Sequence, residues 1–99
     1  MSTTAIDTYV LETLMPDLVG HDRSPSAFLV YLHLWHRTAG AKDRRAEVSL
    51  AQMAEETGLS KSAVQAALRL LKRRKLVKAE RESITAVPVY EVLRPWVRR

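Results

Sequence analysis

Basic side chains gather in one stretch of the sequence, where their charge could bind a ligand. The run from Lys61 to Arg81 holds eight cations and one anion. Residues 60–99 carry eleven basic and three acidic side chains, whereas residues 1–59 carry five basic and eight acidic ones. Such a block attracts polyanions, since duplex DNA carries a negative charge about every 1.7 Å along its axis. A charge run also suits a merely solvated surface, so it indicates nucleic acid only on a suitable fold.

Residues for catalysis or metal binding are sparse. His33 and His36 stand three positions apart with His21 upstream, a spacing that a metal could use. No carboxylate pair stands nearby and the chain has no cysteine, so we expect surface or half-buried histidines and no metal site. The three glycines form no phosphate-binding loop, and nothing marks a nucleophile elbow or a triad. We predict no enzyme activity, no catalytic residue and no cofactor.

Length and composition predict a single globular domain over residues 1–99. Apolar residues make up 46% and charged residues 27%, which excludes a disordered chain. Barrels and doubly wound sheets need roughly twice this length. No apolar stretch approaches the roughly 18 residues of a membrane span, and the N-terminus lacks the basic start of a signal peptide. We expect a cytoplasmic protein without membrane contact, associated with the nucleoid when bound to DNA.

Residues 4–20 are expected to form an N-terminal helix or arm. Five residues of this segment have the spacing of one helical face: Ile6, Tyr9, Val10, Thr13 and Leu14. Thr3 or Thr4 would cap the helix, and Pro16 would end it or bend its exit. A short strand over residues 9–11 is the alternative. The segment would complete a small core or serve as a dimer arm.

A core helix is predicted over residues 25–39. Ser24 is its N-cap, Pro25 suits the first helical position, and Gly40 stops the helix. One face is apolar, with Leu29 and Leu34 beside it: Phe28, Tyr31, Leu32 and Trp35. A short strand is plausible at residues 46–48.

Two further helices with an abrupt turn are predicted over residues 49–74. Ser49 and Gln52 have the spacing of a capping box, Gly58 ends the first helix, and Ser60 caps the second. The first helix faces inward with Leu50, Met53 and Ala54, and the second with Val64, Ala67, Leu68 and Leu71. This pattern is typical of a helix-turn-helix.

Two strands, residues 76–80 and 84–92, follow and are expected to form a wing over residues 76–93. Residues 81–83 would join them. Pro88 cannot donate to a strand ladder, so it belongs at an edge or past the pairing. The wing tip lacks a glycine, which leaves its turn type open.

Residues 50–68 resemble the helix-turn-helix of bacterial winged-helix regulators of the MarR and GntR type. Four positions carry the resemblance: Ala54 allows a close helix crossing, Gly58 a left-handed turn, and Leu59 and Val64 fill the space between the helices. The implied fold is α+β, mainly α: a winged helix-turn-helix with a three-helix core, a two-stranded wing and an additional N-terminal helix.

The resemblance implies that the helix starting at Lys61 enters the major groove. The predicted DNA-binding residues are Ser60, Lys61, Ser62, Gln65, Ala66, Arg69, Lys72, Arg73 and Arg81. Gln65 would pair with adenine, Arg69 with guanine and Ala66 with a thymine methyl. The first three residues would hold a phosphate at the helix N-terminus. Residues 72–75 would neutralise phosphates, and Arg81 would reach the minor groove or its phosphates.

These features predict a protein that binds double-stranded DNA sequence-specifically. We expect a small transcriptional regulator that acts as a homodimer. Its small-molecule effector, if any, is not specified by the sequence. Phage and plasmid replication or copy-control proteins contain similar winged helices and are one alternative. Other winged helices dock on proteins or bind RNA, which is a second alternative. Trp96 would either anchor the C-terminus to the core or lie in a dimer seam.

Overall fold

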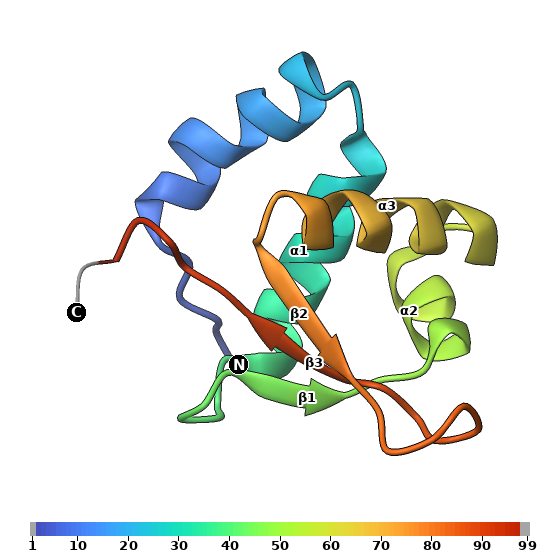
Figure 1. The fold of residues 1–99 in the computed structure, drawn as a ribbon. Coiled ribbons are helices and arrows are strands. Elements are labelled where there is room, and N and C mark those ends of the chain that lie inside the picture. The colour runs from blue at the N-terminus through green and yellow to red at the C-terminus, as the bar shows by residue number, and fades with distance from the viewer. Residues whose placement is uncertain (1, 98–99) are drawn as a thin grey trace.

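The computed structural model describes residues 2–97 as three α-helices packed on a three-stranded antiparallel sheet, preceded by a helical N-terminal segment (Figure 1). In chain order the elements are η1 (Val10–Leu14), η2 (Pro16–His21), α1 (Pro25–Thr38), β1 (Arg45–Glu47), α2 (Leu50–Thr57), α3 (Lys61–Arg73), β2 (Val77–Glu80) and β3 (Val89–Val92). The predicted α+β winged helix with an additional N-terminal helix is therefore confirmed.

Helix α1 forms the centre of the molecule, as its sequence predicts. The hydroxyl of Ser24 accepts a hydrogen bond from the backbone N–H of Ala27 at 3.1 Å, which caps the helix ahead of Pro25. Its buried side chains form much of the core: Ala27, Phe28, Val30, Tyr31, Leu34, Trp35 and Thr38. Leu32 is only half-buried, and Leu29 is exposed. Gly40 lies just beyond the helix end, as predicted.

The N-terminal segment is helical over residues 8–21, with the wide turns of a π-helix. Its buried residues, Val10, Leu14 and Leu18, are four positions apart. The predicted inward positions Ile6, Tyr9 and Thr13 are exposed instead. Ile6 precedes the helical residues, and for Tyr9 and Thr13 the wider turn changes which residues share a face.

The start and the proline of this segment also differ from the prediction. Residues 2–7 are not helical, and the Thr4 hydroxyl contacts Nδ1 of His36 at 2.7 Å instead of capping a helix. The helical segment continues past Pro16, although its first piece, η1, ends at Leu14 just ahead of the proline. Pro16 stands at the first position of η2, where a residue without an N–H loses no helical hydrogen bond.

The sheet has the strand order β1-β3-β2. The short strand β1 therefore pairs with the wing strand β3, on the side opposite to β2. Tyr90 in the central strand lies opposite Ala46 on one side and Ala79 on the other. The prediction of a strand from residue 84 is wrong for residues 84–88, which belong to the wing loop. Pro88 lies just before β3, and its carbonyl accepts a hydrogen bond from Val48 at 3.2 Å. The ladder does not extend through it because proline has no N–H to donate.

The segments next to the two chain ends, residues 5–9 and 93–96, lie side by side against α1 (Figure 1). Trp96 stacks on Tyr9 with ring centroids 4.5 Å apart, and its indole N–H donates to Asp7 at 3.2 Å. The same ring lies 6.5 Å from Trp35, whose own N–H donates to the carbonyl of Ala5 at 2.8 Å. Trp96 thus packs against the core, the first of the two roles that the sequence allowed.

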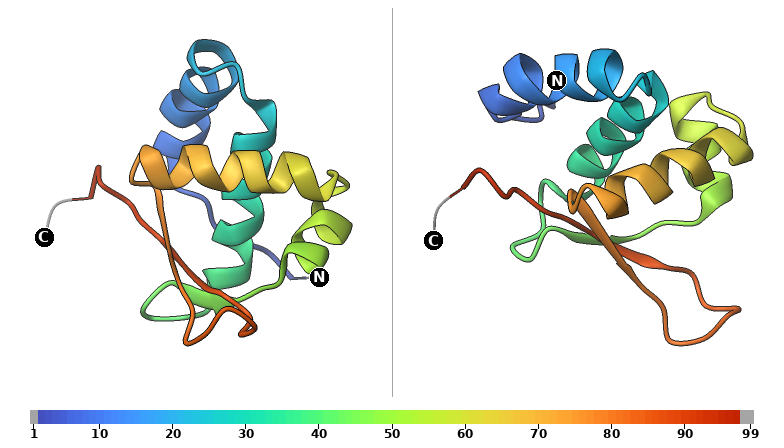
Figure 2. Two further views of the ribbon diagram at one scale, coloured as in Figure 1. Left: turned by 45° about the vertical axis from the view of Figure 1, so that its right-hand side comes forward. Right: turned by 45° about the horizontal axis from the view of Figure 1, so that its top comes forward.

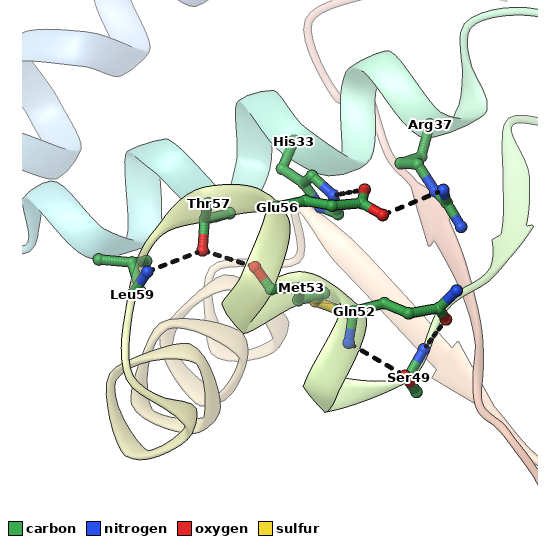
Figure 3. A network of polar contacts seen from close by, with 8 residues as sticks. All are labelled: His33, Arg37, Ser49, Gln52, Met53, Glu56, Thr57 and Leu59. Atoms are coloured by element: carbon green, nitrogen blue, oxygen red, sulfur yellow. Dashed lines mark hydrogen bonds and ion pairs between the residues drawn. The ribbon is translucent and has the colours of Figure 1, made fainter.

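The turn between α2 and α3 is fixed by backbone conformation and one side chain. Gly58 takes the left-handed conformation, with φ of 80°. The Thr57 hydroxyl donates to the carbonyl of Met53 at 2.6 Å and accepts from the N–H of Leu59 at 3.2 Å (Figure 3). Ser49 and Gln52 form the predicted capping box at the other end of α2. The abrupt change of helix direction is therefore fully hydrogen-bonded.

Replacing Gly58 by valine should destabilise the domain by about 1–3 kcal/mol, because a β-branched residue resists positive φ. A Cβ at this glycine would meet nothing within 4 Å, so backbone strain alone sets the effect. Urea unfolding of the unchanged protein and of the Gly58→Val variant measures this difference in the free energy of unfolding. Gly40→Val is the matched control, since Gly40 also has open space around it but no positive φ. Equal stability of both variants would contradict the role of the turn.

Candidate nucleic-acid interface

Helix α3 presents one face to the core and leaves the other uncovered. Ser60 caps it, since the serine hydroxyl accepts from the N–H of Ala63 at 3.1 Å. The four predicted inward residues are all buried: Val64, Ala67, Leu68 and Leu71. In both views of Figure 2, α3 crosses in front of α1 with no other element before it. The outer side of α3 is therefore open to a large ligand.

All nine sequence-predicted DNA-binding residues are exposed, and the structure brings eight of them together on α3 and its cap. At about 100° per residue, the exposed positions of the helix span an arc of roughly 140°. This arc consists of Lys61, Ser62, Gln65, Ala66, Arg69, Lys72 and Arg73, with Ser60 at its N-terminal end. We call it the α3 arc.

The α3 arc has a polar centre with cations at both edges. Gln65 and Arg69 project from its middle, while Lys61 and Lys72 lie along one edge and Arg73 along the other. Hydrogen-bonding groups in the middle suit the edges of bases, and cations at the sides suit the flanking phosphates. Side chains suited to base edges therefore lie in the middle of the α3 arc, and side chains suited to phosphates lie at its two edges.

One cation of the basic block does not belong to this surface. Arg74 donates to Asp17 at 2.5 Å and to Asp22 at 2.6 Å, so it joins the end of α3 to the N-terminal segment. These carboxylates raise the pKa of Arg74, with the Asp17 hydrogen bond as the largest cause. Two carboxylates of the fold therefore already engage the charge that the sequence assigned to DNA phosphates. Among the described residues, no ion pair includes the other cations of α3: Lys61, Arg69, Lys72 and Arg73.

The ninth predicted residue, Arg81, lies apart from the α3 arc on the wing loop. It directly follows β2, and its guanidinium donates to the carbonyl of Ile84 at 3.0 Å. This loop projects away from the helices (Figure 2, right). Ile84 in the same loop is 90% exposed.

A polar clamp that the sequence did not reveal holds α2 against α1 (Figure 3). Nε2 of His33, a nearly buried residue of α1, lies 2.7 Å from a carboxylate oxygen of Glu56, and Arg37 lies 3.5 Å from the other oxygen. The hydrogen bond with His33 lowers the pKa of Glu56. The His33–Glu56 pair spans 23 positions, so only the packing of the helices brings it together. The clamp therefore joins α2 to α1.

The histidines do not converge on a metal site within residues 2–97. His33 contacts Glu56, whereas His36 contacts Thr4. The one cluster of potential ligands there is Asp17, His21 and Asp22, and Arg74 already binds both of its carboxylates. The hydrogen bond with His21 is the largest cause that lowers the pKa of Asp22.

The helices of residues 2–97 are too short or too polar to span a lipid bilayer.

The chain was compared with known families and proteins. Residues 32–83, more than half of the chain, match the MarR family. The matched region runs from α1 through the helix-turn-helix into the wing loop, so it contains the α3 arc and Arg81. No match was found among curated proteins. The MarR family is a regulatory, DNA-binding family and not a family of enzymes. With its winged helix-turn-helix and a family match over this region, the chain belongs to the MarR family.

Proposed function

We propose that this domain binds double-stranded DNA sequence-specifically and acts as a small transcriptional regulator, with α3 lying in the major groove. The observation that carries this function is the α3 arc, an uncovered helix face with hydrogen-bonding side chains in the middle and unpaired cations at its edges. The groove of B-DNA is wide enough to admit a helix of this kind. The family match supports the same conclusion.

The roles of the α3 arc residues follow from their positions. Gln65 offers paired donor and acceptor groups for adenine, and Arg69 offers a fork of donors for guanine. Ala66 leaves room for close approach and can touch a thymine methyl. Lys61, Lys72 and Arg73 contact phosphates on either side, together with Ser60 and Ser62 at the helix N-terminus. Arg81 on the wing loop contacts the adjacent minor groove or its phosphates.

Selection from a pool of random duplex DNA at two salt concentrations, followed by sequencing, tests this function. We expect enrichment of a two-fold symmetric motif, with half-sites about 34 Å apart, since a homodimer presents two copies of α3. Salt-sensitive binding without enrichment would contradict sequence specificity. A lack of binding at low salt would contradict DNA binding altogether and redirect attention to docking on another protein.

The substitution Arg69→Ala should weaken binding to the preferred site by about 1–3 kcal/mol and relax discrimination at one base pair, because Arg69 lies in the middle of the α3 arc. Lys72→Ala is the matched comparison, since it also removes one unpaired cation from the same helix. It should weaken binding to all sequences alike and reduce the slope of the salt dependence by about one. Fluorescence anisotropy on specific and scrambled duplexes measures both. Equal loss on every sequence for Arg69→Ala would exclude its role as a base reader.

A second copy of the chain is proposed to cover the N-terminal segment, as a homodimer requires. Beside its buried row lies an exposed apolar row of Leu11, Met15 and Val19, which are 45%, 39% and 37% exposed. The row is evenly spaced about Met15, so two antiparallel copies would place Leu11 against Val19 of the second molecule and Met15 against itself. Such self-complementarity is what a two-fold interface needs. The other flank is already occupied, since Tyr9 stacks on Trp96 and Asp17 binds Arg74.

Introducing a charge in the middle of this row should dissociate the dimer. Met15→Glu would place two carboxylates at the two-fold axis, and sedimentation velocity should then show a monomer where the unchanged protein is a dimer. Thr13→Glu serves as control because Thr13 is exposed on the opposite side of the buried row and should leave the dimer intact. A monomeric unchanged protein, or a Met15→Glu variant that still dimerises, would exclude this interface.

A further inference from the structure

A cavity of about 560 Å³ lies beside the turn between α1 and β1 and the end of β3. Most of its polar lining is cationic: Lys42, Arg44, Arg45 and Arg94 face Asp43 and Glu91. Two valines complete the lining. The volume is within the range of roughly 300–1,000 Å³ that small-molecule sites occupy. None of the lining residues belongs to the α3 arc or the wing loop.

The cations of this cavity differ in whether a carboxylate already neutralises them. Arg45 lies 2.9 Å from Glu80 and 4.0 Å from Glu91. Arg94 lies 3.4 Å from Asp7. Arg44 forms no ion pair among the described residues, and its Nη1 is buried without a hydrogen-bond partner. Arg44 is therefore the one arginine of this lining that no carboxylate neutralises among the described residues.

The structure holds Arg44 in this place from several sides. Its backbone has a φ of 53°, which non-glycine residues rarely adopt. Its N–H donates to Ala41 at 3.2 Å, and its carbonyl accepts from Val92 at 2.9 Å. Its guanidinium carbon lies 4.7 Å from the centre of a Trp35 ring, and this tryptophan is only 2% exposed. These contacts fix the position of Arg44 on the cavity wall.

We infer that this cavity binds a small anion, a carboxylate or a phosphate group, through the guanidinium of Arg44. A guanidinium presents parallel donors that match the oxygens of either group, and that of Arg44 packs against the Trp35 ring. Lys42 on the same cavity wall adds a second positive charge. The two acidic residues Asp43 and Glu91 engage Arg45, through its backbone N–H at 3.2 Å and its side chain at 4.0 Å, so neither replaces the missing partner of Arg44. The inference does not depend on DNA binding.

Tryptophan fluorescence of the full chain tests the site, because both tryptophans lie in the aromatic cluster that Arg44 covers. Sodium benzoate, sodium acetate and sodium phosphate are titrated separately, each against sodium chloride at equal ionic strength. We expect a saturable change with at least one probe and no saturable change with chloride. Saturation by the carboxylates alone or by phosphate alone supports the site and identifies which group it takes.

Paired arginine variants show whether the binding passes through Arg44. Arg44→Gln should weaken the probe at least about 10-fold, since it removes a charge-assisted hydrogen bond. Arg23→Gln is the matched control: Arg23 has a φ of 52°, is exposed and does not line the cavity. It loses the same charge and should change the affinity less than about twofold. No saturable response to any probe, or equal weakening by both variants, overturns the inference. Urea unfolding of each variant confirms that it is folded.

Discussion

The burial of α3 against α1 is the interaction on which the rest of the structure depends. Val64, Ala67, Leu68 and Leu71 of α3 are buried in the core that α1 organises. Once these four are inside, the helical period leaves the α3 arc outside. Three features fix α2 in this arrangement: the capping box sets where it begins, the left-handed Gly58 sets where it ends, and the contact between His33 and Glu56 joins it to α1. The same packing that gives the fold its stability therefore places the proposed DNA contacts.

A second constraint holds the segments next to the two chain ends against α1. Trp35 lies between the guanidinium of Arg44 and the ring of Trp96, and it also binds the backbone of Ala5. The hydroxyl of Tyr31 donates to the carbonyl of Leu93 at 2.9 Å, and burial raises the pKa of this phenol. One side of α1 thus packs against α3. Its aromatic residues Tyr31 and Trp35 contact residues near both chain ends, namely Ala5, Leu93 and Trp96. A cluster of this kind ties the anion cavity to the centre of the fold.

Local sequence signals predicted the helix-turn-helix well. The residues that cap or end α1, α2 and α3 act through neighbours within a few positions, so their roles can be predicted from the sequence. These residues are Ser24, Ser49, Gly58 and Ser60. The N-terminal segment was predicted less well because its turns are wider than those of an α-helix, which moves Tyr9 and Thr13 out of the buried row. Contacts between distant positions, such as His33 with Glu56, leave no local pattern to detect.

Arg74 shows why charge alone does not define an interface. It lies in the same basic run as Lys72 and Arg73, and the sequence gives no reason to separate the three. The structure separates them through two aspartates more than 50 positions away, which neutralise Arg74 and leave its neighbours unpaired. Arg44 is the reverse case, since it stands in the more acidic half of the chain yet has no carboxylate partner among the described residues. Which cations remain free to bind a ligand therefore depends on the tertiary contacts of each, as the contrast between Arg74 and Arg44 shows.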